Sequence, residues 1–178
     1  GGLHFADFCR QVLKDTNEVV GYYDATIRSD DPFPDREAFH GPDPTLFAIE
    51  RIFSTGINSL LRQEFGLKTD RAYELLSMEV NTAWKIDDKK HALDLYIGAT
   101  DDLRYAMSLN SSMKVYMTHG YYDLVTPFHA ANRIRRLMKL SPNAKKKFTV
   151  KHYEGGHMFY SWKKSRVEFT KDLKEFYL

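Results

Sequence analysis

Two short apolar runs, each followed by a loop that contains glycine, constrain the fold of this chain more than any other feature. The first is Met113–Phe128 (MKVYMTHGYYDLVTPF), and the second is Lys151–Tyr160 (KHYEGGHMFY). Each run is of β type, and each loop carries one polar residue that chemistry could use, Asp123 in the first and His157 in the second. A helix-like segment lies between them. The order of strand, loop, helix, strand and loop predicts the α/β class.

Periodicity supports this reading after residue 113. The pattern predicts strands over 114–118 and 148–153, a helix over 128–140 that Ser141-Pro142-Asn143 ends, and a C-terminal helix from Trp162 to Tyr177.

The first part of the chain reads mostly as helix. Apolar residues at helical spacing predict helices over 3–14, 45–65, about 70–80, and 91–109 with a break near Gly98. Residues 17–27 are predicted to be extended, and 84–88 to form a turn. Residues 28–44 hold all but two of the six prolines, which predicts a loop or a mobile insertion.

Two predicted strands cannot form a stable sheet alone, so we expect the chain to be part of a larger fold. Residues 1–90 carry 11 Lys/Arg and 16 Asp/Glu, whereas residues 91–178 carry 15 and 8. This uneven charge indicates two structural parts. We predict a mostly helical cap or insertion region over 1–112, followed by an α/β segment over 113–178.

Composition excludes several classes of function. A net charge of +2 is too small to argue for nucleic acid, and Lys145-Lys-Lys147 is best read as a solvated loop. The single cysteine, Cys9, excludes an internal disulfide and a cysteine-based metal site. The histidines lack metalloprotease spacing, and no apolar run is long enough for a membrane span. We therefore expect no metal, no cofactor and no membrane span. The sequence begins with Gly1-Gly2 and not with methionine. We therefore expect this start to be either a cleavage site or a boundary chosen in the laboratory.

Asp123 and His157 have the chemistry of two members of a Ser-His-Asp triad. Such a triad needs a histidine base that a buried carboxylate orients. Loops that follow neighbouring strands point at one side of a sheet, and the separation of 157 − 123 = 34 residues leaves room for one helix and one return strand. The alternative reading is a loop-capping aspartate and a surface histidine.

The same residues resemble a known family. Gly120-Tyr-Tyr-Asp-Leu-Val-Thr-Pro127 followed by Gly155-Gly-His-Met158 is similar to the last two triad motifs of the serine carboxypeptidases, which have the α/β-hydrolase fold. Val20-Gly-Tyr-Tyr-Asp24 and Gly41-Pro-Asp-Pro-Thr45 resemble the bacterial members more weakly. The resemblance implies catalytic roles for Asp123 and His157 and a substrate-pocket role for Met158. It also implies a secreted or periplasmic protein.

The chain departs from that family in one important respect. No Gly-x-Ser-x-Gly elbow occurs in it, and Ser54 and Ser77 lie in helical patterns where such an elbow cannot form. Ser108, Ser111 and Ser112 precede the aspartate but lack flanking glycines. In the family the serine lies upstream, so we expect this chain to be inactive alone.

The resemblance implies a C-terminal portion of a serine-type carboxypeptidase that hydrolyses C-terminal peptide bonds once joined to its upstream part. Its expected partners are a peptide substrate and that upstream part. Acyl transfer or ester hydrolysis on the same fold, and a non-catalytic interaction module, remain alternatives. His119 is either an ordinary loop histidine or a residue that supports Asp123. Tyr121 replaces an aspartate common in plant and fungal members, so the pH dependence stays open.

Overall fold

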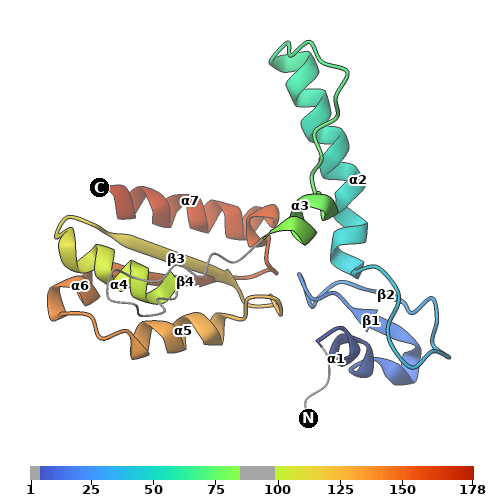
Figure 1. Cartoon of the computed structure of the whole chain (residues 1–178), viewed down its shortest axis with the longest axis horizontal. Coiled ribbons are helices and arrows are strands. Elements are labelled where there is room, and N and C mark those ends of the chain that lie inside the picture. The colour runs from blue at the N-terminus through green and yellow to red at the C-terminus, as the bar shows by residue number, and fades with distance from the viewer. Residues whose placement is uncertain (1–4, 85–98) are drawn as a thin grey trace. The chain divides into compact units, whose positions relative to one another are not determined.

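The computed structural model describes residues 5–84 and 99–178, which form two compact units (Figure 1). The first unit comprises residues 1–22 and 27–86, and the second comprises residues 23–26 and 87–178. The boundary predicted between residues 112 and 113 therefore falls inside the second unit. The part of the chain that the structure describes is a mixture of helices and small sheets, in agreement with the α/β class.

The second unit contains a parallel pair of strands with helices around it. Its strands are β3 (Val115–Gly120) and β4 (Phe148–Tyr153), which pair from Val115 with Phe148 to Gly120 with Tyr153. Both predicted strands are thus confirmed. The helices of this unit are α4 (Ala99–Leu109), α5 (Phe128–Leu137), α6 (Pro142–Lys146), the 3-10 turn η3 (Phe159–Ser161) and α7 (Lys163–Tyr177).

One face of the β3–β4 pair carries the apolar core. Met107 of α4 packs there with Met138, Leu140 and Phe148, and all four side chains are buried. Side chains alternate between the faces of a strand, so Val150 reaches the same core as Phe148. The packing of Met107 explains why α4 belongs to this unit, although the sequence assigned residues 99–109 to the helical region predicted over 1–112.

The other face of the strand pair is aromatic and is covered by α7. Tyr116 lies against Phe176, with 5.0 Å between ring centroids, and Tyr153 packs edge-on against Phe169 at 5.6 Å. The Tyr153 hydroxyl also donates a 2.8 Å hydrogen bond to Asp172 of α7. Figure 1 shows α7 and α5 on opposite sides of the strands. The strands are therefore enclosed between helices, which fixes the loops at their ends.

The first unit is built around a short hairpin and one long helix. Strands β1 (Glu18–Val20) and β2 (Arg28–Asp30) pair antiparallel. Its helices are α1 (Phe5–Gln11), the 3-10 turn η1 (Lys14–Thr16), α2 (Pro44–Ser59), a π-helical turn η2 (Leu60–Glu64) and α3 (Met78–Ala83). Asp43 caps α2 by accepting the Leu46 N–H at 2.9 Å, close to the predicted helix start.

Residues 28–44 contain more structure than the predicted loop. Strand β2 lies inside this stretch, and the segment after it is fastened by Arg10 of α1. The Arg10 Nε atom lies 2.5 Å from Asp31 Oδ2, and its two terminal nitrogens donate to backbone carbonyls of four residues, Phe33, Pro34, Arg36 and Glu37. A single guanidinium group therefore organises a segment whose composition predicted mobility.

One predicted helix differs from the structure, and one predicted helix end has a second role. The helix expected over about 70–80 is only α3, because Asn58 of α2 holds the preceding segment by two bonds to the Tyr73 backbone, at 2.7 and 3.1 Å. The helix predicted over 128–140 ends before Ser141, at Leu137, and Ser141 also caps the start of α6 through a 3.2 Å bond from the Ala144 N–H. The prediction for residues 91–98, and that for 85–88, lie outside the described residues.

Candidate active site

The first candidate residue, Asp123, lies three residues beyond the end of β3 and is buried, with 3% of its surface exposed. Its Oδ1 atom accepts the backbone N–H groups of Val125 and Thr126, both at 2.9 Å. Its Oδ2 atom accepts the Thr126 hydroxyl at 2.5 Å and lies 2.8 Å from His157 Nδ1. All four contacts suit a charged carboxylate.

These contacts decide the charge of Asp123. Burial disfavours the carboxylate, but the hydrogen bonds from Thr126, together with the bond and the charge of His157, outweigh burial and lower the pKa of Asp123 below its ordinary value. Asp123 is therefore ionised at neutral pH, as an orienting acid must be.

The second candidate residue, His157, lies in the loop after β4. Gly155 precedes it with a φ of +122°, a conformation that favours glycine, and the His157 backbone N–H donates to the Tyr23 carbonyl at 2.6 Å. The Tyr23 ring meets the imidazole edge-on at 5.4 Å between centroids. The His157 side chain is 42% exposed, so a substrate can reach it.

The Asp123 loop and the His157 loop can approach each other closely because glycines lie where they meet, and a distant aspartate binds the His157 loop. A Cβ atom on Gly120 would overlap the carbonyl oxygens of Gly155 and Gly156, and one on Gly156 would overlap Tyr23 and Asp24. The buried Asp24 accepts the Gly156 N–H at 3.1 Å. Residues 23–26 thus form the third segment of the site, beside the loops that carry Asp123 and His157.

The short distance between Asp123 and His157 fixes the histidine tautomer. A carboxylate oxygen has no proton to donate, so the 2.8 Å contact requires a proton on Nδ1. In neutral His157 the Nε2 atom is therefore the free base. Nε2 makes no hydrogen bond within residues 5–84 and 99–178, and no serine hydroxyl of those residues is bonded to the ring. The pair could accept a proton from a nucleophile placed beside it.

The structure brings together the two residues predicted as catalytic. Met158 follows His157 directly and is half-buried, and its substrate-pocket role stays a prediction. His119 is the residue before Gly120, and its Nδ1 lies 3.0 Å from the Thr126 carbonyl, so it contacts the Asp123 loop without contacting Asp123.

Sequence reasoning missed three contributors to the site: Thr126, Tyr23 and Asp24. Thr126 was visible as a hydroxyl three residues after Asp123, a spacing at which an aspartate can accept local hydrogen bonds. Tyr23 and Asp24 lie in the stretch Val20-Gly-Tyr-Tyr-Asp24 that resembles the bacterial members, but nothing in this stretch indicated a contact with the His157 loop, because the chain separates Asp24 from Gly156 by 132 residues.

A cluster of rings lies beside the site. His152 of β4 lies 6.2 Å from His119, 5.8 Å from Tyr121 and 5.1 Å from Phe128, measured between ring centroids. Its Nδ1 is buried without a hydrogen bond in the described part of the chain, and its Nε2 lies 3.3 Å from Asn132 Oδ1. Burial, followed by the nearby His119 and His129, lowers the pKa of His152.

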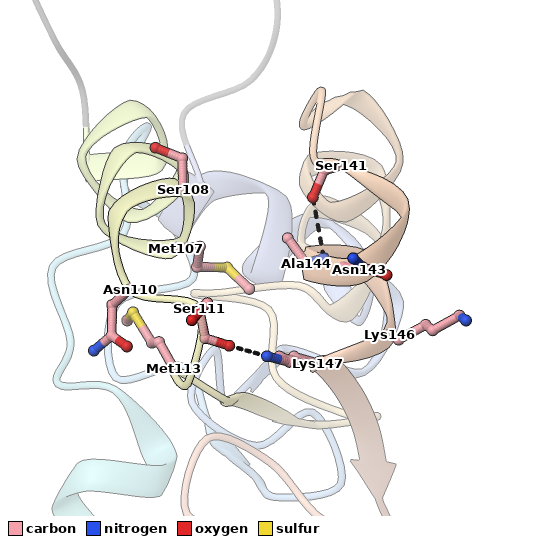
Figure 2. A pocket seen from close by; sticks show the side chains of 10 residues that line it. All are labelled: Met107, Ser108, Asn110, Ser111, Met113, Ser141, Asn143, Ala144, Lys146 and Lys147. Atoms are coloured by element: carbon pink, nitrogen blue, oxygen red, sulfur yellow. Dashed lines mark hydrogen bonds between the residues drawn. The ribbon is translucent and has the colours of Figure 1, made fainter.

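A cavity of about 450 Å³ between α4 and α6 is a different feature of the second unit (Figure 2). Met107, Met113 and Ala144 form its apolar part, and the Lys147 ammonium donates to the Ser111 carbonyl across it. Figure 2 shows the Lys146 side chain pointing away. No residue of the Asp123 or His157 loop lines this cavity, so it adds nothing to the site.

The described residues offer no site for a metal ion. They contain no cluster of three or more histidine, cysteine, aspartate or glutamate side chains that could hold one.

Among the helices over residues 5–84 and 99–178, none is both long and apolar enough to cross a membrane.

No protein-family model, curated protein or solved structure matches this chain.

Proposed function

We propose that this chain is the C-terminal portion of a serine-type carboxypeptidase with an α/β-hydrolase fold, and that it supplies the acid and the base of a Ser-His-Asp triad. The contact that carries the proposal is the 2.8 Å bond between Asp123 Oδ2 and His157 Nδ1, made by a buried carboxylate and an exposed imidazole. Each residue follows the carboxyl end of one of two neighbouring parallel strands. This placement supports a hydrolase site.

In the proposed mechanism, Asp123 keeps the proton of His157 on Nδ1 and stabilises the imidazolium ion that forms. His157 Nε2 takes the proton of a serine hydroxyl as the serine attacks the scissile carbonyl, and then gives it to the leaving amine. Water, activated by the same nitrogen, hydrolyses the acyl-enzyme. The serine would come from a polypeptide segment outside these 178 residues. Met158 would contact the substrate's C-terminal residue.

The test is kinetic and uses the chain joined to a segment that carries a Gly-x-Ser-x-Gly elbow. His157→Ala should lower kcat for a peptide with a free C-terminal carboxylate by about 10⁴-fold or more, because the base is lost. His40→Ala, which removes an exposed histidine of the first unit, should leave kcat unchanged. The 178-residue chain alone should release no amino acid.

Two results would contradict the proposal. Normal turnover in the His157→Ala variant would show that His157 is not the general base. Equal cleavage of amidated and free C-termini, or faster turnover of simple esters than of peptides by the unaltered enzyme, would point to another hydrolase or to an acyltransferase.

A further inference from the structure

We propose that Thr126 is a positioning residue whose hydroxyl holds the Asp123 carboxylate in the orientation in which Oδ2 receives the Nδ1 proton of His157. The significance of this inference for catalysis rests on the function proposed above. The geometry on which it is based, however, belongs to the described chain itself.

The two oxygens of Asp123 are held in different ways. Backbone N–H groups of its own loop hold Oδ1. The Oδ2 atom that faces His157 has the Thr126 hydroxyl as its other donor, at 2.5 Å. The imidazole is 42% exposed, so the His157 ring is less confined by packing than the buried carboxylate. Without the Thr126 hydroxyl, Oδ2 would keep only the bond to His157, and the rest of the carboxylate's orientation would come from the two backbone bonds to Oδ1.

The direction of the Thr126 bonds follows from the distances. Thr126 Oγ1 lies 2.5 Å from Asp123 Oδ2 and 3.2 Å from His157 Nδ1. The charged Asp123 carboxylate can only accept a hydrogen bond, and His157 Nδ1 already carries a proton. The proton of the Thr126 hydroxyl therefore points to the carboxylate. A lone pair of Oγ1 then faces the Nδ1 proton, so that proton is shared between Oδ2 and Oγ1. One hydroxyl thus favours both the charged acid and the Nδ1–H tautomer.

The Thr126 backbone is itself fixed. Its N–H donates to Asp123 Oδ1, and its carbonyl lies 3.0 Å from His119 Nδ1. The next residue, Pro127, is the N-cap of α5. The Thr126 side chain is exposed, so replacing it disturbs no core packing. These features separate a positioning role from a general contribution to folding.

The experiment compares three variants of the 178-residue chain by NMR. Thr126→Val keeps the shape and removes the hydroxyl, and Thr126→Ser keeps the hydroxyl. Thr170→Val is the matched control, because the Thr170 hydroxyl donates only to a carbonyl of its own helix, that of Arg166 at 2.7 Å. Long-range proton–nitrogen spectra report the tautomer of His157. Side-chain carboxyl carbon shifts report the pH at which Asp123 takes up a proton.

We expect Thr126→Val to reduce the signal of the Nδ1–H tautomer of His157. The same change should raise the pH at which Asp123 is protonated, because a bond that favours the carboxylate is lost. Thr126→Ser should restore both readouts, and Thr170→Val should change neither. Unchanged readouts in Thr126→Val, or a Thr126→Ser variant that behaves like Thr126→Val, would overturn the proposal.

A second readout separates this inference from the proposed function. In the chain joined to its serine segment, Thr126→Val should lower kcat by about tenfold with little change in KM, because the group acts on the base and not on the substrate. A normal kcat in that variant would overturn the catalytic significance of Thr126. If the unaltered joined protein lacks peptidase activity while the NMR changes occur, the carboxypeptidase proposal fails and Thr126 still orients the pair.

Discussion

The loops that carry Asp123 and His157 and the proline-rich segment over residues 31–37 are both irregular, but they are held in opposite ways. The two site loops are joined backbone to backbone, since the Tyr121 and Tyr122 N–H groups donate to the carbonyls of Tyr153 and Gly155, both at 3.0 Å. Segment 31–37 is held largely by the side chain of Arg10, whose partners are spread over several residues.

The two kinds of contact make the two regions sensitive to different substitutions. Backbone contacts at van der Waals distance tolerate no added atom, so the site loops depend on the absence of side chains at Gly120 and Gly156. A region tied by one guanidinium group depends on the presence of that group. The comparison therefore predicts that adding one carbon atom damages the second unit, whereas removing one side chain damages the first.

The largest expected effect is that of Gly156→Ala. The new Cβ would overlap the Tyr23 carbonyl and the Asp24 side chain, so residues 23–26 must move away from the His157 loop. We expect a loss of about 3 kcal/mol in unfolding free energy, measured by hydrogen exchange of the β3 and β4 amides. Gly56→Ala in α2 is the control, because nothing lies within 4 Å of the new atom and the helix should gain up to about 1 kcal/mol. Equal effects of the two substitutions would contradict the comparison.

A smaller effect is expected for Arg10→Ala. The side chain of Asp31 is 2% exposed and would lose its cationic partner, and four carbonyls would lose a donor. We expect about 2 kcal/mol of lost stability, confined to exchange of first-unit amides such as that of Asp31. Arg28→Ala breaks the exposed Arg28–Glu18 pair and should cost less than about 0.5 kcal/mol. Matching losses in both variants would show that segment 31–37 does not depend on Arg10.

The smallest effect concerns pH and the ring cluster around His152. Its pKa is lowered by burial and by His119 and His129, so the unfolded chain binds more protons just below pH 6.5 and stability falls as the pH decreases through this region. His152→Phe should flatten this part of the curve of unfolding free energy against pH for the second unit. If the His152→Phe variant keeps the full slope of unfolding free energy against pH, another group causes the pH dependence.

The sequence predicted the second unit better because its signals are local. Short apolar runs flanked by turn residues predicted β3 and β4, and glycines near Asp123 and His157 marked the loops that the structure brings together. The first unit depends on single side chains that reach distant backbone. Asn58 binds the Tyr73 backbone and Arg10 binds carbonyls more than 20 residues away, and neither contact leaves a periodic pattern.

The limits of prediction at the site have the same physical origin. Thr126 was part of a recognised motif, but a sequence cannot show that its hydroxyl lies 2.5 Å from Asp123 Oδ2. The contact of Asp24 could not be placed, because a carboxylate in the loop between β1 and β2 gives no indication of which N–H group it will accept.

The contact of residues 23–26 with the His157 loop has a consequence for the order of folding. The strands β3 and β4 pair residues 33 positions apart, as in Val115 with Phe148, whereas Asp24 meets Gly156 across 132 positions. Closing the longer loop costs more chain entropy and is slower. A newly made chain can therefore pair β3 with β4 before residues 23–26 contact the His157 loop. The site is then completed after the strand pair that carries it.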